Sequence, residues 1–203
     1  MNRAVIKKGL DTIAANDKDV KKALRQLDYP APRIRPAGFE TLASTIVSQQ
    51  LSTKAANAIM GRLRDLLPEL SPAAVLSTRK TSLRKVGLSE RKVEYIKGLA
   101  KAIKTGKFNP DQLQQMDDAT AVAEITTLHG FGQWSAEIYL MFSLGRHDIF
   151  PANDLALQVA LKNLKQLKQK PSPAVARELV AHWAPWRSVG SLFLWHFYQG
   201  APT

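Results

Sequence analysis

Residues 128–134 read LHGFGQW, a stretch in which Gly130 and Gly132 flank one apolar residue. The pattern predicts one helix that ends near Leu128 and another that starts near Gln133, with a sharp turn between them. Glycine lets another backbone come close, and the free N–H groups at the start of the second helix favour an anion. The stretch therefore indicates a phosphate-binding hairpin. A plain corner between two helices is the alternative, because two glycines alone are a weak signal.

The rest of the chain also reads as helices joined by short turns, so we expect an all-α fold. Ser52 can cap a helix that follows it. Ser71-Pro72, Asn109-Pro110 and Ser172-Pro173 each place a capping side chain before a proline suited to the first helical position. Residues 189–198 are apolar on nearly all sides, which predicts a buried helix. No run of alternating β-branched residues indicates a strand. The best candidate for a linker is the proline-rich segment 29–38.

The basic charge of the chain is concentrated in its first half. The formal charge of the 203 residues is +12. Residues 1–107 hold 22 Lys and Arg against 9 Asp and Glu, whereas residues 108–203 hold 7 against 8. A basic half beside a neutral half indicates a face for a polyanion, and an evenly solvated surface is the alternative. A basic helix lying on a membrane fits less well, because the Lys and Arg are scattered over several predicted helices.

The sequence contains no cysteine. This excludes a disulfide framework, a Cys-ligated zinc or iron–sulfur site and a cysteine nucleophile. The four His show no metal-binding spacing. The apolar stretches are too short to cross a bilayer and no signal peptide is evident, so we expect a cytoplasmic, nucleoid-associated protein.

Asp154, in the segment IFPANDLALQ, is a candidate functional carboxylate at the start of a predicted helix. The helix dipole favours a negative charge at that place. Capping alone is the simpler explanation, because Asp is common at the first position of helices.

The hairpin, together with a lone Asp154 that opens a later helix, resembles the helix-hairpin-helix DNA glycosylases. The similarity continues at VSQQLS (47–52), which looks like the family's DNA-inserting turn, and at VGLSERKVEYIKGLA (86–100), which resembles its second, degenerate hairpin. The segment WAPWRSVGSLFLW (183–195) is similar to the C-terminal part of the alkylbase branch, the DNA-3-methyladenine glycosylase II type. The resemblance covers roughly residues 36–198.

This resemblance implies a two-lobed helical HhH-GPD fold with the active-site cleft between the lobes. Residues 37–145 would form a six-helix lobe that ends in the hairpin, and residues 1–36 with 146–203 would form the second lobe. Some bacterial members of the branch carry an extra β-containing N-terminal domain. Because the helical core starts near residue 36, we expect a compact form without that domain.

The activity that the resemblance implies is base excision repair of alkylated purines such as 3-methyladenine and 7-methylguanine. Asp154 would stabilise an oxocarbenium-like sugar and would orient or deprotonate the attacking water. Bifunctional members carry a nucleophilic Lys where this chain has Trp134, so we expect a monofunctional enzyme without lyase activity. The lack of cysteine sets the chain apart from the iron–sulfur members, and we expect no required cofactor.

The same resemblance implies roles for further residues. The walls of the base pocket would be Trp134, Trp195, Phe39 and Tyr139, with Ile138 where the branch's best-known pocket has a Tyr. Gln50 would fill the gap that the flipped base leaves. DNA phosphates would meet the backbone N–H groups of Gly130, Gly132 and Ser135, and the side chains of Thr53 and Lys54. A structural Na⁺ or K⁺ would bind the backbone carbonyls of Thr126, Leu128 and Phe131.

Two other functions stay open on the sequence alone. One is a non-catalytic helix-hairpin-helix protein that binds damaged DNA, and the other is a glycosylase for a deaminated or mismatched base. In each case the expected partner is double-stranded DNA, no membrane is involved, and a monomer fits.

Overall fold

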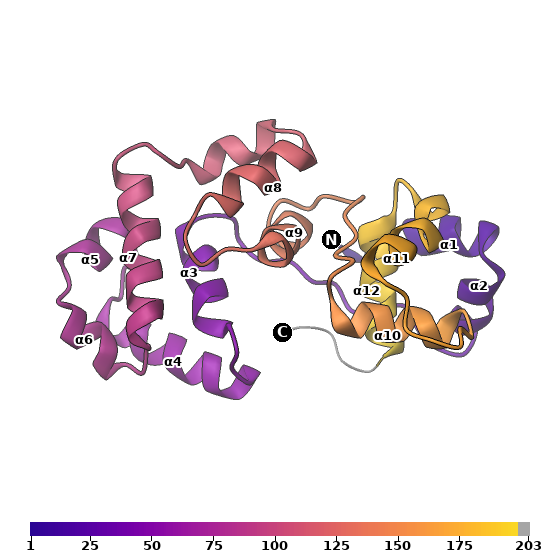
Figure 1. Cartoon of the computed structure of the whole chain (residues 1–203), viewed down its shortest axis with the longest axis horizontal. Coiled ribbons are helices and arrows are strands. Elements are labelled where there is room, and N and C mark those ends of the chain that lie inside the picture. Colours follow the sequence, from indigo (N-terminus) through magenta and orange to yellow (C-terminus); the bar gives the residue numbers. More distant parts are fainter. Residues whose placement is uncertain (199–203) are drawn as a thin grey trace. The chain divides into compact units, whose positions relative to one another are not determined.

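The computed structural model describes residues 1–198, and every regular element within them is a helix (Figure 1). The predicted all-α fold is thus confirmed. The contacts divide the chain into two compact units. Unit 1 consists of Met1–Ile34 with Leu140–Thr203, and unit 2 is Arg35–Tyr139. The lobes expected from the sequence were 1–36 with 146–203 and 37–145, and residues 199–203 of the former lie outside the described part.

Unit 2 is built around one long helix. Its elements are α3 (Phe39–Ser48), α4 (Thr53–Leu66), α5 (Pro72–Ser77), α6 (Lys80–Lys85), α7 (Glu90–Lys104), the 3₁₀ helix η1 (Pro110–Gln115), α8 (Asp118–Thr126) and the first part of α9 (Gln133–Phe142). Helix α7 packs against α3, α5 and α6. It buries Val93, Ile96, Leu99 and Ala100, which recur at helical spacing along one face. The hairpin segment joins α8 to α9 in this unit.

The capping residues of unit 2 begin its helices as predicted, with one difference. Ser52 accepts from the backbone N–H of Ala55, and Ser71 from that of Ala74, so both act as N-caps of α-helices. Asn109 also caps a helix that starts at Pro110, but this helix is a 3₁₀ helix of six residues. The predicted helix start at Asn109-Pro110 is therefore confirmed, and the helix that begins there is of the 3₁₀ type.

Unit 1 gathers helices from both ends of the chain. Its elements are α1 (Arg3–Asn16), α2 (Lys18–Leu24), α10 (Leu155–Leu164), α11 (Pro173–Leu179), the 3₁₀ helix η2 (Ala181–Trp183) and α12 (Arg187–Phe197). Helix α12 packs against α1, α10 and η2, and all of its residues from Ser188 to Trp195 are buried. This confirms the predicted buried helix as far as Trp195, while Tyr198 at its end is 44% exposed.

The proline-rich segment 29–38 contains no regular element, as expected of a linker, and it leads from α2 to α3. The N-terminal ammonium of Met1 donates to the carbonyl of Arg33, which fixes the first part of this segment in unit 1. In unit 2, the N–H of Gly38 donates to the hydroxyl of Tyr139 at 2.8 Å. Among the helices of residues 1–198, none has the length and apolar character needed to cross a membrane.

Candidate functional site

The hairpin contains two glycines with different surroundings. Gly130 has φ +97°, and a Cβ there would lie 2.4 Å from Cδ2 of Tyr95, a residue of α7. The turn therefore demands glycine at 130 for both conformation and space. Gly132 is exposed, and a Cβ there would meet nothing within 4 Å. The fold itself does not demand glycine at 132, so this position leaves room for a group that approaches from outside.

Helix α9 begins next to Gly132. The N–H of Ala136 bonds to the carbonyl of Gly132, so the backbone of Gln133, Trp134 and Ser135 forms the first turn. The N–H groups of a first turn have no partner inside the helix and can bind an anion. Gly132 and Gln133 are exposed, whereas Ser135 is buried, with 6% of the residue exposed. The exposed part of this first turn is therefore at Gly132 and Gln133.

The turn between α3 and α4 is tied to the hairpin. The side-chain amide of Gln49 donates to the carbonyl of Gly130 at 2.7 Å. The ammonium group of Lys92, on α7, donates to the carbonyls of Val47 and Gln49 at 2.7 and 2.8 Å. Burial lowers the pKa of Lys92. Helix α7 therefore supports both structures, since Tyr95 lies one turn after Lys92 and covers Gly130.

Gln50 stands at the tip of this turn. It is exposed and has φ +56°, a left-handed conformation that a residue other than glycine adopts at a cost of about 1–3 kcal/mol. The bonds of Gln49 to its neighbours hold that conformation in place. Leu51, the next residue, is an apolar side chain that is 39% exposed. Thr53 and Lys54 follow at the start of α4 and are also exposed.

Asp154 is the N-cap of α10 and is nearly buried, with 9% of its surface exposed. Its Oδ1 accepts from the N–H of Leu157 at 2.9 Å and from the indole Nε1 of Trp195 at 3.2 Å. The first bond is the helix-capping bond that the sequence analysis gave as the simpler explanation for Asp154. The second bond does more than cap a helix, because it orients the carboxylate from α12.

The turn that carries Asp154 is fixed by a second set of bonds. The N–H of Asp154 donates to the carbonyl of Pro151 at 2.9 Å. Gln158, one turn into α10, donates to the carbonyl of Ala152 at 2.7 Å and accepts from Lys170 at 2.5 Å. The carboxylate is thus held on a rigid support, which is what a catalytic group requires.

The neighbouring acid, Asp148, has a structural role. Arg187, the first residue of α12, donates to its two carboxylate oxygens from Nε and from a terminal nitrogen, at 2.8 and 2.7 Å. Burial raises the pKa of Asp148, but the bonds from Arg187 outweigh burial and lower it. Next to this pair, Ser188 donates its N–H to the carbonyl of His147. Asp148 therefore fastens the segment before Asp154 to α12.

The proposed pocket residues differ in how much of each side chain is open. Trp134 is partly exposed. The other four are buried, with exposed fractions of 9% for Phe39, 5% for Ile138, 2% for Tyr139 and 0% for Trp195. Burial raises the pKa of Tyr139. The structure brings Trp195 to Asp154 in unit 1. The other pocket residues belong to unit 2, which also contains the hairpin: Trp134, Phe39, Ile138 and Tyr139.

The structure adds one carboxylate that the sequence analysis did not select. Glu137 lies in α9, three residues after Trp134, and only 7% of its surface is exposed. Its Oε1 accepts from the side-chain amide of Gln133 at 3.0 Å. A charged residue within the apolar run of α9 was the signal that could have pointed to it. Gln49 and Lys92 were missed because contacts with distant segments define their roles, and Leu51 was missed because its exposure cannot be seen in the sequence.

The carbonyls of Thr126, Leu128 and Phe131 lie in and around the turn that leads into α9. The carbonyl of Leu128 accepts the N–H of Phe131 at 3.0 Å, which uses one of its two lone pairs. Backbone carbonyl oxygens can replace the hydration shell of a monovalent cation. Within residues 1–198, no group of three or more His, Asp or Glu side chains is placed to hold a metal ion.

Comparison with known proteins relates this geometry to DNA repair. Residues 43–185 match the family model described as "HhH-GPD superfamily base excision DNA repair protein". The DNA-3-methyladenine glycosylase 1 of Schizosaccharomyces pombe is 29% identical over 161 residues, which are 77% of this chain and 71% of that protein.

Two solved structures are similar over nearly the whole chain. The DNA-3-methyladenine glycosidase of Bacillus halodurans has a TM-score of 0.85 and 32% identity, covering 94% of this chain and 88% of its own. The 3-methyladenine DNA glycosylase of S. pombe, solved in complex with abasic DNA, has a TM-score of 0.83 and 26% identity, covering 93% and 95%.

Proposed function

The chain belongs to the HhH-GPD superfamily of base excision DNA repair proteins, and we propose that it is a monofunctional DNA glycosylase for alkylated purines. The observation that carries the proposal is the setting of Asp154. This carboxylate is nearly buried, opens a helix, and receives the indole N–H of Trp195 on a braced turn. The names of the similar proteins support 3-methyladenine as a substrate.

The leaving base explains why one carboxylate suffices. Glycosidases that act on neutral sugars use a pair, one of which protonates the leaving group. A 3-methyladenine or 7-methylguanine base is cationic in DNA and leaves without protonation. Asp154 then has the remaining task, which is to stabilise the positive charge that develops on the sugar and to orient or deprotonate the attacking water. Asp148 is bound to Arg187 and takes no part.

The DNA is held by its phosphates at the hairpin. The first turn of α9 offers backbone N–H groups, and Gly132 leaves room for a phosphate oxygen to reach them. Thr53 and Lys54, at the start of α4, are exposed and contact a further phosphate. If a Na⁺ or K⁺ binds the carbonyls of Thr126, Leu128 and Phe131, it adds a positive charge beside the phosphate and stiffens the turn.

Base flipping requires a side chain that replaces the lost base. Extruding a base costs a few kcal/mol, and less for a damaged one. Gln50 stands at the tip of its turn, exposed and held by the bonds of Gln49, and fills this role. The exposed Leu51 adds an apolar surface that can enter the stack beside Gln50.

The flipped base stacks on Trp134 of unit 2. This indole is the member of the proposed pocket whose side chain is partly open. Stacking on an aromatic ring contributes about 1–3 kcal/mol per base, and a cationic base gains a further cation–π attraction. Trp134 also supplies no amine for a Schiff base, so the enzyme leaves the abasic strand intact.

The experiment that tests the proposal is a panel of duplexes, each with a single lesion. The lesions are 3-methyladenine, 7-methylguanine, hypoxanthine and ethenoadenine, with an undamaged duplex as control. Free base is measured by chromatography, and strands are examined before and after alkali. We expect release of the alkylated bases. The strands should stay intact before alkali treatment and should break after it. Tight binding without release would identify a DNA-binding protein, and release of hypoxanthine alone would identify a different glycosylase.

A further inference from the structure

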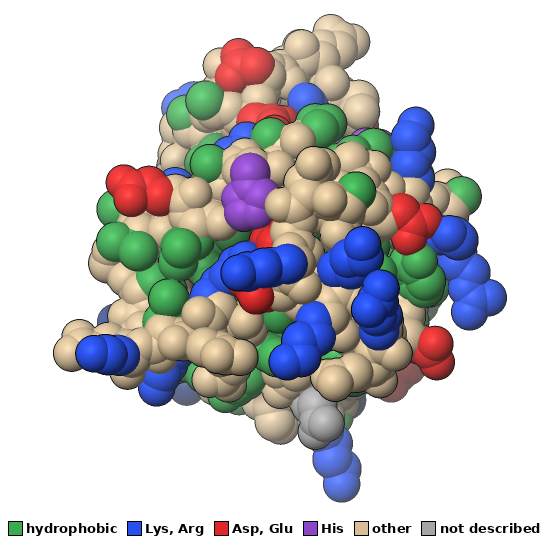
Figure 2. All heavy atoms as spheres, turned by 90° about the vertical axis from the view of Figure 1, so that its right-hand side faces the viewer, with side chains coloured by type: hydrophobic (Ala, Val, Ile, Leu, Met, Phe, Trp, Pro, Cys, Tyr) green, Lys and Arg blue, Asp and Glu red, His purple; other side chains and the backbone are tan. Residues whose placement is uncertain are grey.

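Unit 1 carries a basic face that the hairpin does not explain. Helix α2 packs against α10, and residues 17–25 and 162–170 together hold eight Lys and Arg against two Asp. Figure 2 shows a group of Lys and Arg side chains on this side of the molecule, below a histidine. Six of these cations are exposed, and we call them the α2–α10 basic face: Lys18, Lys21, Lys22, Arg25, Lys168 and Lys170.

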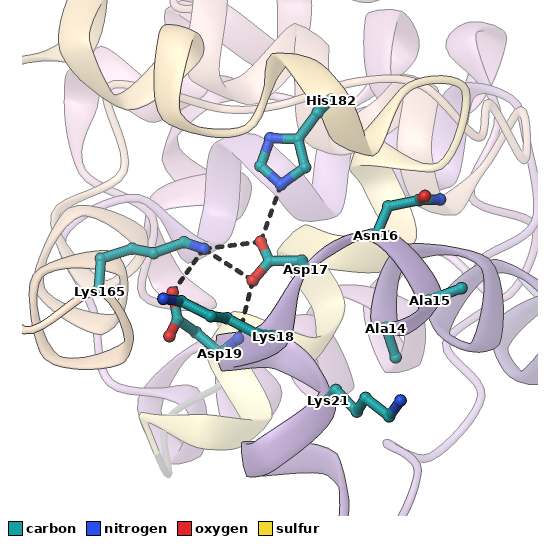
Figure 3. A pocket seen from close by; sticks show the side chains of 9 residues that line it. All are labelled: Ala14, Ala15, Asn16, Asp17, Lys18, Asp19, Lys21, Lys165 and His182. Atoms are coloured by element: carbon teal, nitrogen blue, oxygen red, sulfur yellow. Dashed lines mark hydrogen bonds and ion pairs between the residues drawn. The ribbon is translucent and has the colours of Figure 1, made fainter.

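The two carboxylates in this region are already paired with one buried cation. Lys165, whose side chain is 14% exposed, donates to both oxygens of Asp17 at 2.7 Å and to Asp19 at 2.9 Å. Asp17 also receives bonds from His182 and from the indole of Trp183, at 2.9 and 2.7 Å. Figure 3 shows this network in a surface pocket that Lys18 and Lys21 also line. The carboxylates therefore do not neutralise the exposed lysines around them.

The exposed cations remain available to an external anion. Within residues 1–198, Lys18, Lys21, Lys22, Arg25 and Lys168 make no ion pair with a carboxylate of the chain. On α2, Lys18, Lys22 and Arg25 recur at helical spacing, so they follow one side of the helix. Val20 and Ala23 occupy the buried side. The arrangement is a row of cations on a rigid support, not a set of flexible tails.

The chemistry of the face selects its partner. Protein interfaces have cores of aromatic residues, Met and Arg, and they are depleted in Lys. A membrane-binding helix needs exposed apolar residues on its lipid-facing side. The exposed large apolar side chains of residues 1–198 are Tyr29, Ile34, Leu51, Leu66, Leu155, Val175 and Tyr198, and none lies on α2 or in 162–170. A face of lysines without apolar anchors suits a phosphate backbone, where each contact releases a counterion.

We propose that the α2–α10 basic face binds the phosphate backbone of duplex DNA, as a second contact in addition to the hairpin. The inference rests on the proposed function, since duplex DNA is the substrate of that function. Because the face contacts phosphates, it distinguishes neither base sequence nor lesion. It raises the affinity for long undamaged duplex and so keeps the enzyme on DNA while it searches.

The test is the salt dependence of binding to an undamaged duplex of about 40 base pairs, which offers phosphates beyond a single site. The variant combines Lys21→Gln, Lys22→Gln and Lys168→Gln, three exposed residues outside the Asp17 network. Each phosphate contact contributes about 0.9 to the slope of log K against log salt. We expect the slope to fall by about 2.7 and the affinity near physiological salt to fall at least about ten-fold.

A matched control removes three charges elsewhere. Lys101→Gln, Lys104→Gln and Lys107→Gln change exposed lysines at and just beyond the C-terminal end of α7, the end far from Tyr95 and the hairpin. We expect this control to keep the wild-type slope, and both triple variants to keep the wild-type melting temperature within a few degrees. An unchanged slope in the Lys21, Lys22 and Lys168 variant, or an equal loss in the control, would overturn the inference.

Base release separates this inference from the proposed function. The Lys21, Lys22 and Lys168 variant should release methylated base at the wild-type rate when the enzyme saturates a duplex of about 12 base pairs, because the hairpin and Asp154 are intact. If the wild-type protein releases no base, the proposed function fails. If the slope does not change, the basic face fails, whatever the rate of release.

Discussion

The side-chain amide of Gln49 donates a 2.7 Å hydrogen bond to the backbone carbonyl of Gly130, which joins the tip of the α3–α4 turn to the hairpin. The two residues are 81 positions apart, and each belongs to a structure for which we propose a role toward DNA. Lys92 holds the same turn from α7 through the carbonyl of Gln49. The exposed Gln50 and the proposed phosphate site at the hairpin are therefore linked within unit 2.

Replacing Gln49 by leucine should weaken DNA binding with little change in stability. The substitution keeps the size of the side chain and removes the amide, and a single half-buried hydrogen bond contributes about 1 kcal/mol to folding. We expect the Kd for a duplex with an abasic-site analogue to rise about ten-fold, because the turn that carries Gln50 is no longer held in position relative to the hairpin. A fluorescence titration measures it. Gln115→Leu, at an exposed site in η1, is the control, and equal affinities in both variants would contradict the coupling.

The two hairpin glycines should respond differently to alanine. Gly130→Ala puts a Cβ into the ring of Tyr95 at a positive φ, so we expect the free energy of unfolding to fall by more than about 2 kcal/mol. Gly132→Ala meets open space, and the free energy of unfolding should stay within about 0.5 kcal/mol of wild type. Its Kd for duplex DNA should nevertheless rise, because the methyl group occupies the place of the phosphate. Denaturant unfolding and DNA titration of both variants measure this, and normal binding by Gly132→Ala would argue against a phosphate there.

Trp195→Phe should slow the chemical step without weakening DNA binding. The substitution keeps an aromatic ring against Phe142 and removes the N–H that bonds to Asp154. We expect the single-turnover rate of base release to fall about ten-fold, which corresponds to about 1.4 kcal/mol. Trp183→Phe is the matched control, since it removes an indole bond to a different carboxylate, Asp17, in the same unit. A rate equal to wild type in Trp195→Phe would mean that the indole does not orient the acid.

Acid should destabilise the protein through Asp17. Burial raises the pKa of this carboxyl, but the bonds from Lys165, Trp183, the N–H of Val20 and His182 outweigh it and hold the pKa at about 2, against an ordinary 3.8. A lowered pKa means that the stabilisation is complete above pH 3.8 and is lost as the pH falls toward 2. The Asp17→Asn variant should have a lower free energy of unfolding than wild type, because Lys165 loses its main partner. As the pH falls, this free energy should then decrease less than in the wild type. Urea unfolding between about pH 5 and pH 2 measures both, and identical pH profiles would contradict this account.

The helices of the fold could be predicted because their signals are local. Ser52, Ser71 and Ser172 cap helices as expected, and the apolar pattern after Gln133 marks α9 correctly. Asn109 also begins a helix as expected, but it accepts from the N–H of Asp111, two residues on, and its helix is a 3₁₀ helix. The buried α12 was predicted from composition alone, since a helix that is apolar all round has no face for solvent.

The support of the site could not be predicted, because it consists of contacts between distant segments. The bond from Trp195 to Asp154 spans 41 residues, and that from Lys92 to Val47 spans 45. Neither pairing leaves a pattern in a single sequence. Exposure was equally invisible, and it separates the partly open Trp134 from the buried Phe39.

The role of Asp154 can be tested by Asp154→Asn. Asparagine is as good an N-cap as aspartate, and its Oδ1 can still accept from Leu157 and Trp195, so the fold should be kept while the charge is lost. Asp117→Asn makes the same change at the N-cap of α8 and serves as the control.

The most direct measurement is the single-turnover rate of 3-methyladenine release from duplex DNA by these two variants, with the Kd for abasic DNA measured alongside. For Asp154→Asn we predict a rate at least about a thousand-fold below wild type, a loss of about 4 kcal/mol of transition-state stabilisation, with Kd and melting temperature unchanged. For Asp117→Asn we predict the wild-type rate. Release at the wild-type rate by folded, DNA-binding Asp154→Asn would contradict the catalytic role of this carboxylate.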